Sequence, residues 1–167
     1  MTNDKKYIES IVKGKIAELL CEMIFREDPN KTFTIIPFGY EKTTPELAQY
    51  HDLIKNVETL AVIRQSPDFI LIKNDKSKVH FVEVKYRRYM SKLVKDDLLR
   101  RAKIVSQYWM DTYFFVAVQD GFYFDSCENI IRNSGLVGPL NDSIISSEIQ
   151  SKFLMILKEF IEAKNKK

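Results

Sequence analysis

The sequence predicts an α/β fold in which a mixed β-sheet is flanked by helices, and three observations lead to this expectation. The chain has 167 residues, about the length of one domain with its own core. Apolar residues make up 45% of it and charged residues 29%, which is typical of globular domains and excludes a disordered or low-complexity chain. Segments with helical spacing of apolar residues alternate with short β-branched and aromatic runs. We therefore expect a single domain spanning residues 1–167.

The first part of the chain should form a helix, a strand and a second helix. Residues Tyr7–Phe25 carry apolar side chains three and four positions apart, as in an amphipathic helix that ends before Pro29. Thr32–Phe38 is rich in β-branched and aromatic residues and is predicted to be a strand. Pro45–Asn56 is expected to form a helix with its proline in the first turn.

The middle of the chain should form a β-hairpin followed by a long helix. Asp68–Ile72 is a short apolar strand, and Val79–Tyr86 is its expected partner across a polar turn. Ser91–Met110 has helical periodicity, so its basic side chains should point outward. The positions of this helix expected to point inward are Leu93, Val94, Leu98, Ala102, Val105 and Trp109.

The last part of the chain should add a second hairpin and a closing helix. Thr112–Val118 is a very apolar strand, and Asp120-Gly121 is a strong turn signal that leads into Phe122-Tyr123-Phe124. Ser147-Glu148-Ile149-Gln150 has the pattern of a capping box and should open the last helix. No internal repeat or linker interrupts this order, which agrees with a single domain.

Composition excludes several classes of protein. No apolar run approaches the roughly 18 to 20 residues of a membrane helix, and the first residues lead into no signal-peptide segment, so a cytoplasmic location and no membrane partner are expected. Cys21 and Cys127 form no Cys-x-x-Cys pair, and the histidines are His51 and His80, so no zinc-site spacing exists. Both cysteines should be buried free thiols.

Positive charge is concentrated in one segment of the chain. The formal net charge is only +3, but Lys85–Lys103 holds eight basic residues against two acidic ones, so a polyanion would be met by one surface. Such contacts to phosphates would position a nucleic acid without reading its sequence. A solvated helix face is the alternative explanation. The residues expected to contact nucleic acid are Arg87, Arg88, Lys92, Lys95, Arg100, Arg101 and Lys103.

The residues that could carry chemistry lie on the first predicted hairpin. Successive side chains of a strand alternate between its faces, so Glu83 and Lys85 should project together, away from Val82 and Val84. Asp68 begins the partner strand, where a suitable register brings its carboxylate close to that of Glu83. Paired carboxylates repel each other and are typical ligands of Mg²⁺ or Mn²⁺. With Lys85 to orient or deprotonate a water, the pattern indicates phosphodiester hydrolysis.

These residues resemble the motif of a known superfamily. Pro67-Asp68, followed after a hairpin by Glu83-Val84-Lys85, is similar to the motif of the PD-(D/E)xK nucleases, which include type II restriction enzymes and Holliday-junction resolvases. Gly14-Lys15-Ile16-Ala17-Glu18 resembles the Gly-x-x-Ala-Glu element that many of these nucleases carry in a preceding helix. The resemblance covers about Lys13–Phe124 and implies a restriction-endonuclease-like core of three layers, α/β/α.

The resemblance also implies the roles of individual residues. Asp68, Glu83, Glu18 and the carbonyl of Val84 would be metal ligands, and Lys85 would be the catalytic lysine. The implied activity is that of a Mg²⁺- or Mn²⁺-dependent endonuclease acting on DNA. A homodimer, formed through the hairpin Tyr113–Phe124 or through the last helix, is a further expectation.

Two features depart from the pattern of the superfamily. On a helical wheel with about 100° per residue and Ile8 at zero, Glu18 falls at about 280°, whereas the expected apolar stripe centres at about 60°. An exposed glutamate is therefore the alternative, with Glu22 as a substitute in the site. The stretch Gly39–Gln65 is also longer than a compact resolvase needs, and within it lie Glu41, a turn glutamate or extra site acid, and His51, to which spacing assigns no partner.

Two other functions compete with the nuclease hypothesis. The first is a catalytically inactive subunit that keeps the nuclease fold and binds DNA or assembles a complex. The second is a structural interaction protein in which Glu83 and Lys85 are an exposed ion pair worth about 0 to 1 kcal/mol. Duplex, branched and single-stranded DNA, as well as RNA, all stay candidate substrates.

Overall fold

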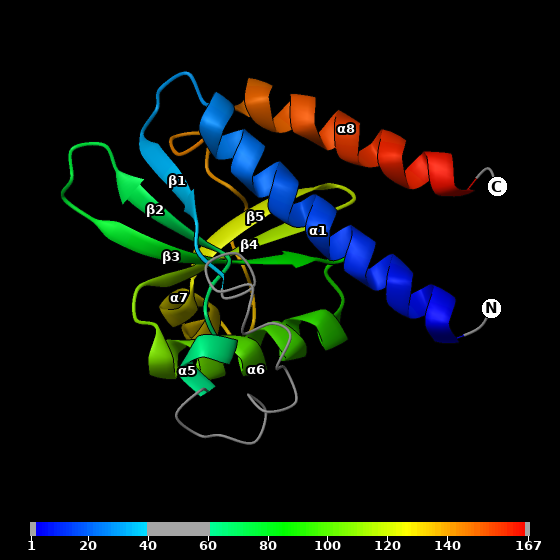
Figure 1. The fold of residues 1–167 in the computed structure, drawn as a ribbon, viewed down its shortest axis with the longest axis horizontal. Helices are drawn as coiled ribbons and strands as arrows, with labels where there is room; N and C mark the ends of the chain where they lie inside the picture. Colours follow the sequence, from blue (N-terminus) through cyan, green and yellow to red (C-terminus); the bar gives the residue numbers. More distant parts are fainter. Residues whose placement is uncertain (1–2, 40–60, 166–167) are drawn as a thin grey trace.

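The computed structural model describes residues 3–39 and 61–165, which form a sheet with helices on both of its faces (Figure 1). The described strands are β1 (Phe33–Pro37), β2 (Phe69–Lys73), β3 (Val79–Tyr86), β4 (Thr112–Val118) and β5 (Gly121–Ser126). The described helices are α1 (Asn3–Glu27), α5 (Ala61–Arg64), α6 (Lys92–Tyr108), α7 (Cys127–Arg132) and α8 (Ser147–Asn165). None of these helices is long and apolar enough to cross a bilayer.

The described sheet is mixed and has five strands in the order β1-β2-β3-β4-β5. Neighbouring strands are antiparallel except β3 and β4, which run parallel. A parallel pair needs a long crossover connection, and α6 supplies it. The predicted α/β class and mixed sheet are confirmed, as is the expected hairpin of β2 and β3.

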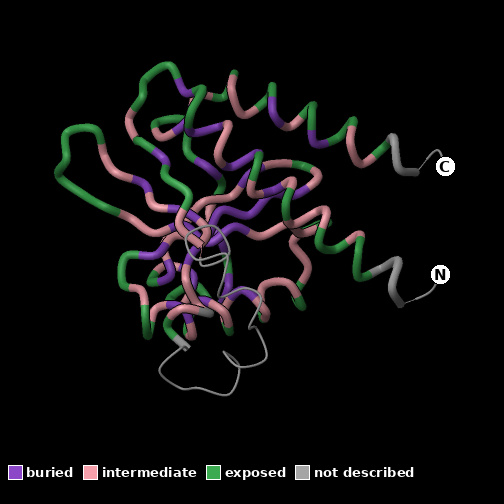
Figure 2. Tube along the Cα trace, viewed as in Figure 1, coloured by how far each residue is buried: buried purple, intermediate pink, exposed green. Residues whose placement is uncertain are grey.

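Two hydrophobic cores fill the space between the layers. One core lies between the sheet and the layer of α1 and α8, and it includes Leu20, Ile24 and Phe153. The other lies between the sheet and the layer of α6 and α7, and it includes Leu98 and Ile130. Figure 2 shows the buried residues concentrated along the strands between these layers. The expected three-layer α/β/α arrangement is thus present.

Strand β4 belongs to both cores. Phe115 and Ala117 pack toward α1, whereas Phe114 and Val116 pack toward α6. A strand covered on both faces needs apolar residues at successive positions, which explains the continuous apolar run in the sequence. The side chains of β4 are thus used inside the molecule, whereas those of β5, the other strand of the Tyr113–Phe124 hairpin, are mostly only partly buried. Helix α8 does expose Met155 and Ile156, which are 62% and 44% exposed.

The inward face of α6 differs from the predicted one at Leu93. This side chain is 81% exposed, because the buried positions Leu98, Ala102 and Val105 define a stripe that Leu93 does not share. Trp109 ends the helix and packs edge-on against Phe81, with 5.0 Å between the ring centroids.

Two further differences concern the elements themselves. Helix α7 is absent from the prediction; it is a short helix capped by Ser126, whose side chain accepts a hydrogen bond from the N–H of Asn129. The predicted helix Pro45–Asn56, together with Glu41 and His51, lies outside the described residues. Cys21 and Cys127 are both buried, as expected, and neither forms a disulfide.

Candidate active site

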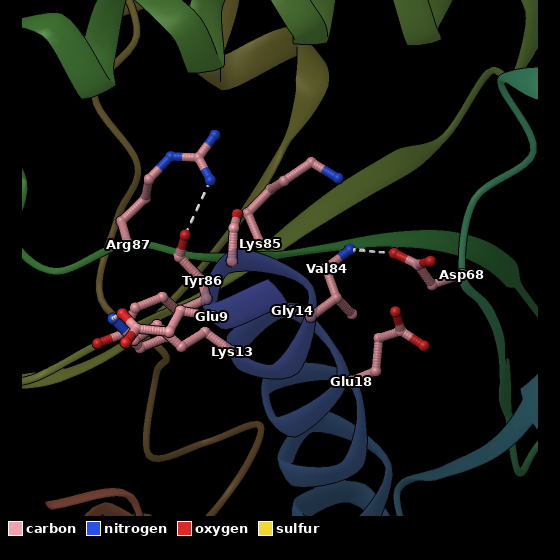
Figure 3. A pocket seen from close by; sticks show the side chains of 10 residues that line it. Glu9, Lys13, Gly14, Glu18, Asp68, Val84, Lys85, Tyr86 and Arg87 are labelled. Atoms are coloured by element: carbon pink, nitrogen blue, oxygen red, sulfur yellow. Dashed lines mark hydrogen bonds and ion pairs between the residues drawn. The ribbon is translucent and has the colours of Figure 1, made fainter. Parts of the chain in front are cut away.

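A cavity of about 410 Å³ opens between the amino-terminal half of α1 and the end of β3 (Figure 3). It contains most of the residues to which the sequence assigned chemistry. The residues that line it are Glu9, Ser10, Lys13, Gly14 and Glu18 from α1, Asp68 before β2, and Val84, Lys85, Tyr86 and Arg87 from the end of β3.

Asp68 is fixed where β2 begins to separate from β3. Its Oδ2 accepts a hydrogen bond of 2.7 Å from the backbone N–H of Val84, and its carbonyl accepts one of 2.9 Å from Phe38. The register pairs Phe69 with Val82, so one further step along both strands places Asp68 opposite Glu83. The juxtaposition that the hairpin predicted is therefore present.

The charge of Asp68 is held in an unfavourable environment. Burial, and then the negative charge of Glu83, raise the pKa of Asp68 to about 7, although Lys85 and the Val84 N–H act in the opposite direction. Glu18 contributes a smaller upward effect on the same pKa. Three carboxylates from three separate elements therefore share one electrostatic neighbourhood, which is typical of functional sites.

Glu83 and Lys85 form an ion pair on one face of β3. The Lys85 ammonium donates to Oε1 of Glu83, and their side chains are only 18% and 11% exposed. The alternative of a structural interaction protein assumed that this pair is exposed, but both charges are largely withdrawn from water. Buried charges of this kind need partners, which each supplies to the other. Lys85 lines the cavity, whereas Glu83 does not, and the charge of Glu83 also acts on the buried thiol of Cys127 by raising its pKa.

Glu18 reaches the cavity because the buried face of α1 is not the predicted one. Ile8, Ile11 and Leu19 are exposed, and the residues that pack on the sheet are Ala17, Leu20, Cys21 and Ile24. This stripe centres at about 170° on the same helical wheel, so Glu18 lies at its border. The Glu18 side chain is 17% exposed and forms an ion pair of 3.2 Å with Lys15.

The alternative for Glu18 is therefore wrong. The exposed-glutamate interpretation assumed a stripe that includes Ile8 and Ile11, and these side chains are 59% and 47% exposed. Glu22, the substitute, does not line the cavity and instead pairs with Arg26 at 2.6 Å.

The donors at this site fit a hard divalent cation in their chemistry. The carboxylates of Asp68, Glu83 and Glu18 are oxygen ligands of the kind that Mg²⁺ and Mn²⁺ prefer, and Val84 also lines the cavity. The raised pKa of Asp68 is the penalty that a cation would relieve. Within residues 3–39 and 61–165, however, no three acidic, histidine or cysteine side chains are already gathered as a metal-binding group. Lysines hold two of the carboxylates instead.

The predicted nucleic-acid contacts divide into two groups. Arg87 lines the cavity and donates to Asp97 at 2.5 Å and to the Tyr86 carbonyl at 2.8 Å. Asp97 also accepts from Arg100 at 2.6 Å and lies 3.9 Å from Arg101. The sequence did not indicate that one carboxylate would hold three arginines. The ion pairs of the described residues leave Arg88, Lys92, Lys95 and Lys103 without such a partner.

The sequence interpretation missed the α1 residues before Gly14. Lys13 lies 3.9 Å from Glu9, and its ammonium lies 6.0 Å from the centre of the Tyr86 ring. Ser10, Lys13, Gly14 and Ala17 recur at spacings of three and four, so the face of α1 that is buried over the sheet continues over the cavity. That spacing is a signal that could have identified these residues.

Two residues of chemical interest lie outside the cavity. The ring of His80 lies 4.9 Å from that of Tyr113 and 6.3 Å from that of Phe33, and burial lowers its pKa. Burial, and then the charge of Glu83, raise the pKa of Cys127 to about 12, so this thiol is a poor nucleophile.

The comparisons with known proteins add one similarity. No protein-family model matches the sequence, and no curated protein does so either. Among solved structures, the chain is similar to Hjc, a Holliday junction resolvase from the archaeal hyperthermophile Archaeoglobus fulgidus. The similarity has a TM-score of 0.37 and 14% sequence identity, and it covers 81% of this chain and 98% of that one.

Proposed function

We propose that the protein is a metal-dependent nuclease of the PD-(D/E)xK superfamily, and that it hydrolyses phosphodiester bonds in DNA as an endonuclease. The observation that carries the proposal is the position of Asp68. Its carboxylate accepts from the Val84 N–H, its backbone lies opposite Glu83, and it lines the same cavity as Glu18 (Figure 3). Asp68, Lys85 and Glu18 line one cavity although they are far apart in the sequence, and Glu83 pairs with Lys85; this arrangement supports the motif that the resemblance implies.

Asp68, Glu83 and Glu18 would hold a Mg²⁺ or Mn²⁺ ion, with the Val84 carbonyl as a further ligand. When bound, such an ion supplies charge stabilisation for a phosphoryl oxygen and a water of lowered pKa. The protein's own contribution is to keep these carboxylates together despite their repulsion. The hydrogen bond from Val84 and the packing of α1 supply that preorganisation.

Lys85 is the residue that we propose to act on the attacking water or on the developing charge. Its side chain is 18% exposed and lines the cavity, so it is shielded from bulk water yet reachable by substrate. An ammonium in such a position interacts strongly with a phosphate oxygen, because the local dielectric constant is low. Lys13 and Arg87 line the same cavity and add positive charge for the phosphate backbone.

The test is cleavage of labelled supercoiled, linear, single-stranded and four-way-junction DNA, and of RNA, in Mg²⁺ or Mn²⁺. We expect the native protein to cut DNA, and Lys85→Ala and Asp68→Ala each to lose about 100-fold or more of that rate. Lys158→Ala and Glu159→Ala are matched controls, because both residues are exposed on α8, which contributes no residue to the lining of the cavity, and they should leave the rate unchanged.

The outcomes separate the competing functions. A native protein that cuts no substrate but binds DNA with a steep salt dependence would be the inactive nuclease-fold subunit. A protein that neither cuts nor binds would be the structural interaction protein. Cleavage that persists in both site variants would reject Asp68 and Lys85 as the site.

A further inference from the structure

The connection between β3 and α6, together with the first turn of α6, presents two large apolar side chains to solvent beside the candidate active site. Tyr89 is 61% exposed and Leu93 is 81% exposed, and Arg87, two residues before Tyr89, lines the cavity. Figure 1 shows this connection at the edge of the sheet below the amino-terminal half of α1, which forms the other wall of the cavity.

Packing does not require Leu93 to point where it does. Leu98, Ala102 and Val105 already cover the sheet with the inward face of α6. A single exposed leucine needs no explanation, but Tyr89 and Leu93 are two large exposed side chains only four positions apart, here called the patch, and clustered exposed apolar side chains mark interaction sites.

The segment that carries Tyr89 is held at both ends. The N–H of Arg87 donates to the Ala117 carbonyl at 2.9 Å, and the Arg87 guanidinium donates to Asp97 of α6 at 2.5 Å. The N–H of Ser91 donates to the Tyr89 carbonyl at 3.1 Å, and the Ser91 hydroxyl accepts from Val94 as the cap of α6. A restrained segment loses little conformational entropy when it binds a ligand.

The surroundings of the patch are cationic. Arg88 and Lys92 are both exposed, and they lie next to Tyr89 and Leu93 in the sequence. An aromatic ring and an aliphatic chain set among cations are complementary to a ligand that has flat apolar faces and negative charge. Nucleotides have both, but in a duplex the base faces are stacked and only phosphates are presented.

We infer that Tyr89 and Leu93 hold an unpaired base beside the cavity, so that the substrate contains unpaired nucleotides, as in single strands or single-stranded tails of a duplex. The base stacks on the Tyr89 ring, and Leu93 takes the place of the next base in a nucleic-acid stack. Arg88 and Lys92 contact the flanking phosphates. This inference rests on the proposed nuclease function and names the substrate class of that same site.

The experiment measures binding rather than cleavage, in EDTA, by fluorescence anisotropy. The probes are a labelled single-stranded oligonucleotide, the blunt duplex of the same sequence, and that duplex with a single-stranded tail. We expect Tyr89→Ala and Leu93→Ala each to weaken binding of the single-stranded and tailed probes about tenfold, and of the blunt duplex less than twofold. Tyr89→Phe, which keeps the ring, should bind like the native protein.

Matched controls lie at the other end of α6. Tyr108 and Met110 are 43% and 81% exposed, so Tyr108→Ala and Met110→Ala remove similar side chains away from the patch and should change no affinity. Lys92→Ala should weaken all probes alike and lower the slope of affinity against salt by about one. Circular dichroism melting shows that each variant is folded.

The inference is overturned if Tyr89→Ala and Leu93→Ala leave the single-stranded affinity within twofold of native, or if they weaken the duplex equally. It is also overturned if sedimentation shows a dimer that Leu93→Ala dissociates, because the patch would then be covered by a second copy. Failure of the nuclease proposal is distinguishable from these results. In that case the variants discriminate between probes in EDTA, yet the native protein cuts nothing in Mg²⁺ or Mn²⁺.

Discussion

The carboxylate of Asp68 accepts a hydrogen bond of 2.7 Å from the backbone N–H of Val84. The backbone pairing of β2 with β3 ends at Phe69 and Val82, so beyond that pair a side chain bonds to β3 in place of a backbone carbonyl. This bond fixes Asp68 opposite Glu83, and the register of the hairpin therefore determines the distance between the two motif acids. The resulting repulsion is built into the fold and should be measurable in the metal-free protein.

Asp68→Asn should stabilise the metal-free protein at alkaline pH. The pKa of Asp68 is about 7 in the folded chain against 3.8 as its ordinary value, so the folded state binds more protons between these values and stability falls as pH rises from about 4 to 7. Asparagine removes the charge and keeps an oxygen that can accept from Val84. Urea unfolding in EDTA should show the variant more stable by about 1–3 kcal/mol at pH 8, with little difference at pH 4.

The same variant should lose its response to metal. Native protein should melt at a higher temperature in millimolar Mg²⁺ or Mn²⁺ than in EDTA, because a ligand that binds only the folded state stabilises it. Asp68→Asn should show no such increase, whereas Glu159→Gln on α8 should respond like the native protein. A variant that is less stable than native at pH 8, or that keeps the full metal response, would contradict the electrostatic account of Asp68.

Asp97→Asn should destabilise the protein in a pH-dependent way. Burial alone would raise the pKa of Asp97, but hydrogen bonds from Arg87 and Arg100 outweigh it and hold the pKa below its usual value. The stability from this carboxylate is therefore present above its unfolded pKa and is lost as pH falls through the folded one. We expect the variant to be less stable by about 1 kcal/mol at pH 7, and the difference to shrink progressively as the pH is lowered below about 4.

Asp96→Asn is the control for that measurement. Asp96 is the exposed neighbour of Asp97 on α6, and no ion pair of Asp96 is present among the described residues. It should unfold like the native protein at both pH values. Equal destabilisation by the two variants would show that Asp97 acts only through the overall charge of α6.

Substitutions of Gly14 should separate stability from substrate access. A Cβ at this position would meet nothing within 4 Å, although Gly14 lines the cavity. Gly14→Ala should therefore stabilise α1 by about 0.5–1 kcal/mol, since glycine is unfavourable inside a helix. Gly14→Leu should also fold, but its side chain would enter the cavity and lower cleavage. If Gly14→Leu cleaves DNA at the native rate, the substrate does not bind in this cavity.

The thiols of Cys21 and Cys127 should react slowly with a thiol reagent in the native protein. Both are buried, and the pKa of Cys127 is raised to about 12, so little thiolate exists at pH 8. A chromogenic disulfide reagent should modify both cysteines quickly in denaturant and neither within the same time without it. Rapid labelling of the folded protein would show that the core behind Glu83 opens readily.

The hairpin and the motif residues on it could be predicted because strand alternation is local. Glu83 and Lys85 share a face of β3 in any register, and a short polar turn to β2 brings Asp68 near them. The α1 stripe and Leu93 could not be predicted in the same way. Ile8, Ile11 and Leu93 are apolar and correctly spaced for burial, but the sheet extends under only part of each helix. Which apolar residues are covered depends on where the layers cross.

The part of the site built by ion pairs was also beyond the sequence. Asp97 was there one of two acidic charges in the basic segment, yet in the fold it pairs with Arg87, a residue that lines the cavity. Such contacts depend on the angle at which α6 returns under the sheet after β3. Residue types and spacing do not determine that angle. The sequence therefore identified the basic residues of the segment but not the ion pairs that they form with Asp97.

Helix α8 makes the site dependent on a late part of the chain. Phe153 and Leu157 pack in the same core as Ala17 and Leu20, and Lys152 forms an ion pair with Glu27 of α1. Glu18 is therefore held in place by residues that the ribosome adds long after it. A nascent chain that has not yet released α8 would have its hairpin acids but a loosely seated α1. The cleavage proposed for this protein should thus require that α8 is packed on α1.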